Sequence, residues 1–117
     1  MIVKNLGKLD DRYAVASAEG TTLHLLVDSQ IISFDLSTLQ GDGEVSFDVV
    51  GDENHKISVF GKYYIANIEI PPKEYYYAED KENPIVDEET GAISYPVVRV
   101  AKPLNMNCVT VNLFPLK

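Results

Sequence analysis

The sequence is dominated by short stretches in which every second residue is apolar. This period of two is typical of a β-strand with one buried face. In one such stretch, the apolar Val111 and Leu113 alternate with the polar Asn112. The pattern predicts strands most clearly at residues 22–27, 45–49, 62–70 and 109–113.

Further segments are rich in the β-branched and aromatic residues that suit a pleated sheet. They are residues 2–6, 12–17, 30–35, 55–60 and 96–101. Turn-forming Gly, Asn and Asp residues separate most of the predicted strands. The 3.6-residue repeat of an amphipathic helix does not occur in any long window, and residues 37–40 allow one helical turn at most.

These patterns predict an all-β protein of about nine short strands. Because crossover helices are missing, antiparallel hairpins are favoured over a parallel sheet, and we expect an antiparallel β-sandwich or barrel. The length of 117 residues and the 45% hydrophobic content are sufficient for one buried core. We therefore expect residues 1–117 to form a single β domain.

Residues 71–95 differ from the rest of the chain in being rich in tyrosine, proline and acidic residues. Seven acids and two lysines give this segment a net charge of -5, out of -8 for the whole chain. It is too long for an ordinary turn, and long connections tend to be functional or disordered. We predict one long projecting hairpin or loop, which we call the arm. As a hairpin, it would have residues 75–77 on one side, residues 93–95 on the other and a tip at residues 87–91.

A tyrosine cluster in and beside this segment is the strongest candidate for an interface. Tyrosine combines a large rigid ring with a polar tip and is enriched in protein interfaces. In a strand, the middle one of three consecutive tyrosines faces opposite its neighbours, so that one face is exposed unless both are covered. We predict that the interface contains Tyr63, Tyr75, Tyr76, Tyr77 and Tyr95; the alternative is that these rings pack on the sheet of the domain itself.

Charge and cysteine content restrict the partners and the compartment. Ten Lys and Arg against eighteen Asp and Glu produce a net charge that repels phosphate backbones, so we expect no nucleic acid partner. The single cysteine, Cys108, has no intramolecular disulfide partner and fits a reducing compartment. No apolar stretch resembles a signal peptide or is long enough to cross a bilayer, so we expect no membrane partner and a cytoplasmic location.

Residues suited to nucleophilic catalysis do not form a recognisable motif. Cys108 lies in the apolar, strand-like run 106–111, where we expect it to be a small core residue or to face outward on a strand. His24 and His55 have no second histidine at a ligand spacing. We therefore predict that the protein is not an enzyme and has no catalytic residue.

The acidic residues of segment 71–95 also raise the question of a metal site. A calcium loop needs oxygen ligands at a spacing that wraps one ion, and this segment does not match that pattern. Solvation explains these acids better, so we assign no metal ligand and no cofactor to Glu79, Asp80, Glu82, Asp87, Glu88 and Glu89.

The sequence favours a non-catalytic structural or interaction module that forms a homo-oligomer or binds a protein partner through the arm. Strand edges must be covered, and self-association is a common cover. By analogy at the level of the fold, such modules build repeated assemblies such as phage tails or necks, which would imply a virion location. The alternative is a small-ligand-binding barrel or sandwich, with a cavity lined by Tyr13, Phe60, Tyr63 and Tyr64. A third hypothesis is an enzyme that uses paired carboxylates in a cleft.

Overall fold

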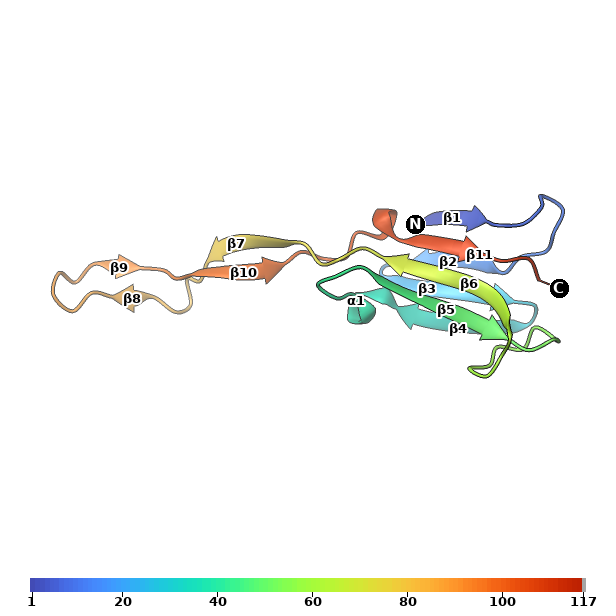
Figure 1. The fold of residues 1–117 in the computed structure, drawn as a ribbon. Helices are drawn as coiled ribbons and strands as arrows, with labels where there is room; N and C mark the ends of the chain where they lie inside the picture. Colours follow the sequence, from blue (N-terminus) through green and yellow to red (C-terminus); the bar gives the residue numbers. More distant parts are fainter. Residues whose placement is uncertain (117) are drawn as a thin grey trace. The chain divides into compact units, whose positions relative to one another are not determined.

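The computed structural model describes residues 1–116 and confirms the all-β prediction (Figure 1). The helical segments in the described part are one turn of α-helix and one turn of 3-10 helix: α1 (Leu36–Leu39) and η1 (Met106–Cys108). The strands are β1 (Ile2–Asn5), β2 (Val15–Glu19), β3 (Thr22–Val27), β4 (Gln30–Asp35), β5 (Val45–Gly51), β6 (Tyr63–Ile70), β7 (Tyr75–Glu79), β8 (Ile85–Val86), β9 (Ile93–Ser94), β10 (Val97–Ala101) and β11 (Thr110–Leu113).

The chain divides into two compact units. The first, which we call the core unit, consists of Met1–Pro72 and the segment that begins at Leu104. The second unit, Lys73–Pro103, keeps the name arm. The arm extends eight residues beyond the end of the predicted segment 71–95, because β10 belongs to it.

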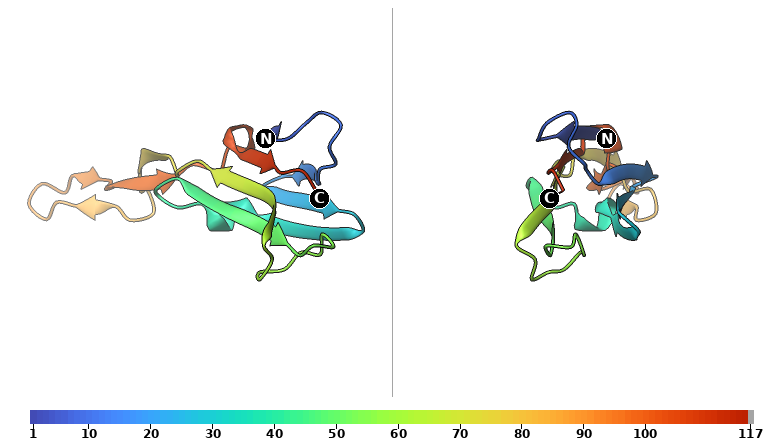
Figure 2. Two further views of the ribbon diagram at one scale, coloured as in Figure 1. Left: turned by 45° about the vertical axis from the view of Figure 1, so that its right-hand side comes forward. Right: turned by 90° about the vertical axis from the view of Figure 1, so that its right-hand side faces the viewer.

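Two sheets form the core unit (Figure 2). One sheet has the strand order β1-β11-β6-β5, and the other has the order β2-β3-β4. All neighbouring strands in them are antiparallel except β1 and β11, where Ile2 lies opposite Thr110 in a parallel pair. Strands from the two ends of the chain are not joined by a tight turn, so they are free to run parallel without a crossover helix.

Apolar side chains from both sheets form a single hydrophobic core. In β3 the alternation seen in the sequence places Leu23, Leu25 and Val27 inward, and all three are fully buried. Ile68 of β6 and Val111 of β11 belong to the same cluster. Burial of each such side chain stabilises the fold by roughly 1.5–3 kcal/mol, so this cluster supplies most of the driving force for folding.

The structure corrects two local predictions in the core unit. Residues 55–60 are not a strand but a loop, with one isolated bridge between Gly51 and Ile57. The backbone of His55 has a φ of 63°, which is incompatible with a continuous strand. Cys108 is exposed in η1, neither buried in the core nor on a strand.

The short helix was located correctly by the sequence. Its single turn begins after Asp35, whose carboxylate accepts a hydrogen bond from the backbone N–H of Ser37 at 3.1 Å. The same carboxylate accepts a bond from the hydroxyl of Thr21 at 3.0 Å. Asp35 therefore caps the helix and ties it to the start of β3.

The fully buried Val111 provides a test of the core. Val111 lies between Val3 of β1 and Ile68 of β6. We expect Val111→Asp to abolish folding, because burying an unpaired carboxylate costs several kcal/mol, about the stability of a small domain. Circular dichroism melting measures the effect. The control is Ile31→Asp, the same kind of change at a side chain that is 69% exposed, and a Val111→Asp variant that melts like the parent would contradict the prediction.

Candidate functional site

The arm consists of two short antiparallel ribbons. In one, β7 pairs with β10, with Tyr77 opposite Arg99. In the other, β8 pairs with β9 around a turn in which the N–H of Gly91 donates to the carbonyl of Asp87 at 2.8 Å. Gly91 has a φ of 72°, a conformation that glycine adopts without strain. The predicted tip at residues 87–91 is confirmed.

Residues 75–77 and 93–95 lie on opposite sides of the hairpin, as predicted, but they belong to different ribbons, which are separated by a turn. Five residues join β7 to β8, whereas two join β9 to β10. The carboxylate of Asp80 organises the longer connection by accepting bonds from the N–H of Glu82 at 3.2 Å and from the amide of Asn83 at 2.7 Å. The extra residues shift the register, so that Tyr75–Tyr77 lie opposite residues 99–101.

The arm has no buried core of its own. Every residue of Lys73–Pro103 is described, and none is buried; the fourteen buried hydrophobic residues all lie in the core unit. A two-stranded ribbon is marginally stable in water without a further surface to pack on. The large apolar side chains that the arm exposes are Tyr76, Tyr77, Ile85, Val86, Ile93, Tyr95, Val97 and Val98.

The tyrosines of β7 divide between the two faces of the ribbon. Tyr75 and Tyr77 share one face, and Tyr76 lies on the other. The guanidinium group of Arg99 lies 3.9 Å from the centre of the Tyr75 ring, an attractive cation–π contact that holds this ring on its face. Tyr77 is the most accessible of the three, with 73% of its surface exposed.

The other two predicted interface tyrosines lie outside β7. Tyr95 follows β9 and precedes Pro96, whose carbonyl accepts a bond from the N–H of Asp80 at 2.8 Å. It therefore lies beyond the Glu79 end of β7 and away from Tyr75. Tyr63 belongs to the core unit, where it begins β6 opposite Gly51.

The core unit contains a second candidate site, a hollow of about 500 Å³. The rings of Tyr64 and Phe114 form part of its wall, with their centroids 5.5 Å apart. The remaining lining residues are Asp52, Glu53, His55, Lys62, Tyr63, Ile65, Pro115 and Leu116. Its size and largely apolar lining are those of a small-molecule pocket.

Only two of the four residues predicted to line a cavity border this hollow. Tyr63 and Tyr64 are among its lining residues, and Tyr13 and Phe60 are not. The hydroxyl of Tyr13 instead donates to the carbonyl of Lys8 at 2.8 Å. Phe60 lies in the loop between β5 and β6, with 91% of its surface exposed.

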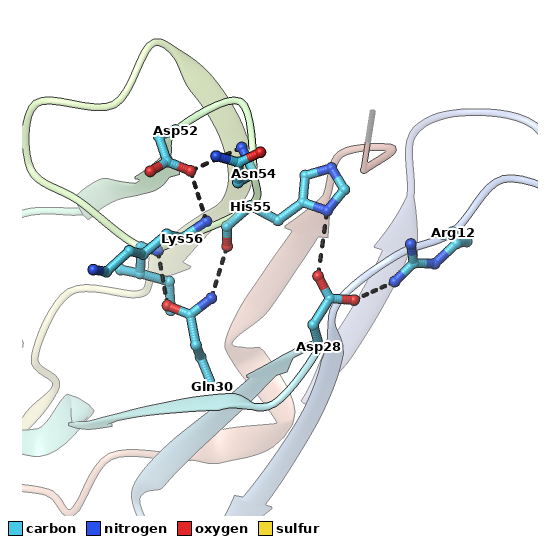
Figure 3. Close-up of polar contacts among 8 residues, drawn as sticks. Arg12, Asp28, Gln30, Asp52, Asn54, His55 and Lys56 are labelled. Carbon is cyan, nitrogen blue, oxygen red and sulfur yellow. Dashed lines mark hydrogen bonds and ion pairs between the residues drawn. The ribbon is translucent and has the colours of Figure 1, made fainter.

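The loop beside the hollow is held by side-chain hydrogen bonds to its backbone (Figure 3). The carboxylate of Asp52 accepts bonds from the N–H groups of Asn54 at 2.9 Å and Lys56 at 3.0 Å. From β4, the amide of Gln30 donates to the carbonyl of His55 at 2.9 Å and accepts from the N–H of Ile57 at 3.0 Å. These four bonds help to fix the loop, and Ile57 also packs against the hydrophobic core.

A charged cluster includes His55 of the same loop (Figure 3). Nδ1 of His55 is 3.3 Å from one carboxylate oxygen of Asp28, and the guanidinium group of Arg12 contacts the other oxygen. The hydrogen bond from Arg12, followed by that from His55, lowers the pKa of Asp28 below its ordinary value of 3.8. Arg12 and Asp28 are well exposed, so this cluster anchors the loop only modestly.

His24, the other histidine considered for chemistry, does not border the hollow. On the surface of the second sheet, Nδ1 of His24 forms a 2.6 Å hydrogen bond with the hydroxyl of Ser33. Within residues 1–116, no group of three His, Cys, Asp or Glu side chains is placed to hold a metal ion.

No described helix has the length and apolar character needed to cross a membrane.

Known proteins give no guide to these sites. No protein-family model matches the sequence, and comparisons with curated proteins and with solved structures give no match. The arm and the hollow must therefore be interpreted from their own residues.

The Asp28 cluster predicts a pH-dependent contribution to stability. Because the pKa of Asp28 is lower in the folded protein, its contribution is present above the unfolded value and is lost as the pH falls through the folded value. We expect Asp28→Asn to be less stable than the parent near neutral pH, with the difference shrinking below about pH 4. Urea unfolding across this range measures the difference.

The partner residue supplies the comparison for this experiment. Arg12→Gln removes the largest cause of the shift and should reproduce part of the pH dependence seen with Asp28→Asn. A difference between Asp28→Asn and the parent that stays constant from neutral to acid pH would show that the ion pair does not stabilise the fold.

Proposed function

We propose that the protein is a non-catalytic structural module that self-associates through its arm. The observation that best supports this proposal is that Lys73–Pro103 buries no side chain of its own while it exposes eight large apolar residues. Exposed apolar surface of this kind marks an interaction site in a stable protein. The aromatic and β-branched composition of the surface is typical of protein contacts rather than of catalysis.

Strand geometry also favours a protein partner. Each two-stranded ribbon has two open edges with unsatisfied backbone groups, and pairing with another chain satisfies them. The arm carries four basic and seven acidic residues, so a second copy can offer it both signs of charge. Closed homo-oligomers are the commonest form of such assembly. By analogy of architecture, the module belongs to a repeated assembly of the phage-tail or neck kind, in the virion or the cytoplasm.

Replacing the arm tests this function. We expect the intact chain to form a defined oligomer, and a variant in which a short Gly-Ser linker replaces Lys73–Pro103 to be a folded monomer. The physical reason is that all buried hydrophobic residues remain in the core unit. Light scattering coupled to size exclusion measures the molar mass, and circular dichroism verifies the fold.

Point variants separate the role of the arm from loss of exposed apolar surface in general. Tyr77→Ser with Val97→Ser should weaken the oligomer, whereas Val59→Ser with Phe60→Ser, which are also highly exposed but lie in the core unit, should not. An intact chain that is monomeric, or an oligomer that survives replacement of the arm, would refute the proposal.

The hollow in the core unit favours a second function, the binding of a small aromatic molecule. The specific observation is a space of about 500 Å³ bordered by Tyr63, Tyr64 and Phe114, next to a loop fixed by Asp52 and Gln30. A preformed apolar site of this size accepts a planar ring by stacking. This function is independent of the arm and compatible with a monomer.

Indole is a suitable probe of the hollow. We expect a titration of the armless variant with indole to give saturable amide shifts confined to residues 52–55, 62–65 and 114–116, because these segments line the space. Tyr64→Ala should reduce the affinity by removing one aromatic wall. Nuclear magnetic resonance measures both effects, and shifts that scatter over the surface or do not saturate would exclude the site.

A further inference from the structure

The two outer edges of the β7/β10 ribbon present different residues to a neighbour. The N–H of Lys102 donates to the carbonyl of Glu74 at 2.8 Å, and the N–H of Asp80 donates to the carbonyl of Pro96 at 2.8 Å. Even-numbered residues of β7 therefore direct their backbone groups toward β10. Because these groups alternate along a strand, those of Tyr77 and Glu79 point to the opposite edge. Within the described residues, β7 is paired with β10 on one side only.

The middle of the open edge of β7 contains no charged residue, proline or glycine that would block strand pairing. The run from Lys73 to Glu79 contains neither proline nor glycine and has three consecutive tyrosines. The edge of β10 is different, because prolines lie close to both of its ends, at Pro96 and Pro103, whereas Pro71 and Pro72 lie on one side of the β7 run only. Two β10 strands aligned antiparallel over their whole length would also place Arg99 opposite itself, and like charges in that position are destabilising.

One antiparallel register of two β7 strands brings together complementary side chains. With a two-fold axis at Tyr76, this tyrosine faces the partner's Tyr76, and Tyr75 faces the partner's Tyr77. Both are aromatic cross-strand pairs. Lys73 faces the partner's Glu79 at each end, which is a pair of opposite charges. In this register, Tyr75 and Tyr77, whose backbone groups point to the open edge, lie opposite one another. An antiparallel ladder of hydrogen bonds requires this arrangement.

The neighbouring registers are less favourable. An axis at Tyr77 places Glu74 opposite the partner's Asp80 and Lys73 opposite the partner's Lys81, so that like charges meet at both ends. An axis at Ala78 separates the tyrosines from one another, since Tyr77 then faces the partner's Glu79. Of these three axes, charge and aromatic pairing together favour the one at Tyr76.

We infer that two copies of the protein associate by antiparallel pairing of their β7 strands about Tyr76, which creates a four-stranded sheet in the order β10-β7-β7-β10. This inference rests on the proposed self-association and specifies the surface that performs it. The Arg99–Tyr75 contact supports the arrangement, because it already holds the Tyr75 ring on the face where the partner's Tyr77 would lie. The resulting sheet ends on both sides at the edge of β10, which stops further pairing.

Charge reversal in the intact chain tests the register. Lys73→Glu and Glu79→Lys each place like charges opposite one another at both ends of the paired strands, and each should weaken association by about tenfold. The double variant Lys73→Glu with Glu79→Lys restores opposite charges and should recover the affinity of the parent. Sedimentation equilibrium over a range of concentrations measures the dissociation constants.

The controls change the net charge by the same amount elsewhere in the arm. Lys81→Glu, in the turn after β7, matches Lys73→Glu, and Glu88→Lys, in the tip turn, matches Glu79→Lys. Neither position lies in the paired strands in this register, so both variants should associate like the parent. Association that the two single reversals leave unchanged, or a double variant as weak as either single one, would overturn the register.

The residue on the axis provides a second, independent test. Tyr76→Lys and Tyr76→Glu should each prevent association when alone, because the new charge faces a copy of itself, and a mixture of the two should form a heterodimer. The backbone groups of Tyr76 face β10, so these side-chain changes leave the ribbon ladder in place. Native mass spectrometry of the mixture identifies the heterodimer, and its absence would contradict an axis at Tyr76.

These results distinguish the inference from the proposed function. A monomeric parent chain would refute both. A parent that is oligomeric and becomes monomeric without the arm, but whose mass is unaffected by changes at residues 73, 76 and 79, would refute the β7 pairing alone. In that case the arm must contact a different surface of the neighbouring copy.

Discussion

The structure depends on a hydrophobic core that is completed without the arm. Side chains from β3, β6 and β11 meet between the two sheets, and the fourteen buried hydrophobic residues among residues 1–116 all lie in the core unit. The arm is therefore left with ribbons ordered by backbone hydrogen bonds and by turns such as the one at Asp80. Because two-stranded ribbons bury little apolar surface, the arm would gain stability by packing on a surface of another chain.

The sequence predicted the strands best where one face is buried. In β3 and β11 the alternation of apolar and polar residues corresponds directly to the alternation of buried and accessible side chains. Residues 55–60 were predicted wrongly, since their composition suits a strand but backbone geometry decides their structure. A β-carbon on Gly61 would lie 2.2 Å from the carbonyl oxygen of Gly51, so this loop closes through a contact between two glycines that no hydrophobic pattern reveals.

The candidate sites were only partly visible in the sequence. Tyr75, Tyr76 and Tyr77 were found from their residue type alone, but their pairing depends on how the Asp80 turn accommodates its extra residues, and no periodic signal encodes that shift. The hollow was predicted from aromatic content, which identified Tyr63 and Tyr64 among its lining residues. The sequence did not indicate that residues 52–55 help to line the hollow. Their position depends on hydrogen bonds between the side chains of Asp52 and Gln30 and backbone groups of the loop, which have no periodic signal in the sequence.

The contrast between the two edges of the arm bears on how such a segment avoids uncontrolled aggregation. An exposed ribbon rich in tyrosine and valine is a hazard if both of its edges accept further strands. Here Arg99 and the flanking prolines make the β10 edge unfavourable, and the acidic residues of the tip oppose close approach of two tips. If pairing is restricted to β7, it closes after two copies instead of continuing into a fibre. Larger assemblies would then need a second contact from the core unit, so that the arm joins neighbours without determining their number.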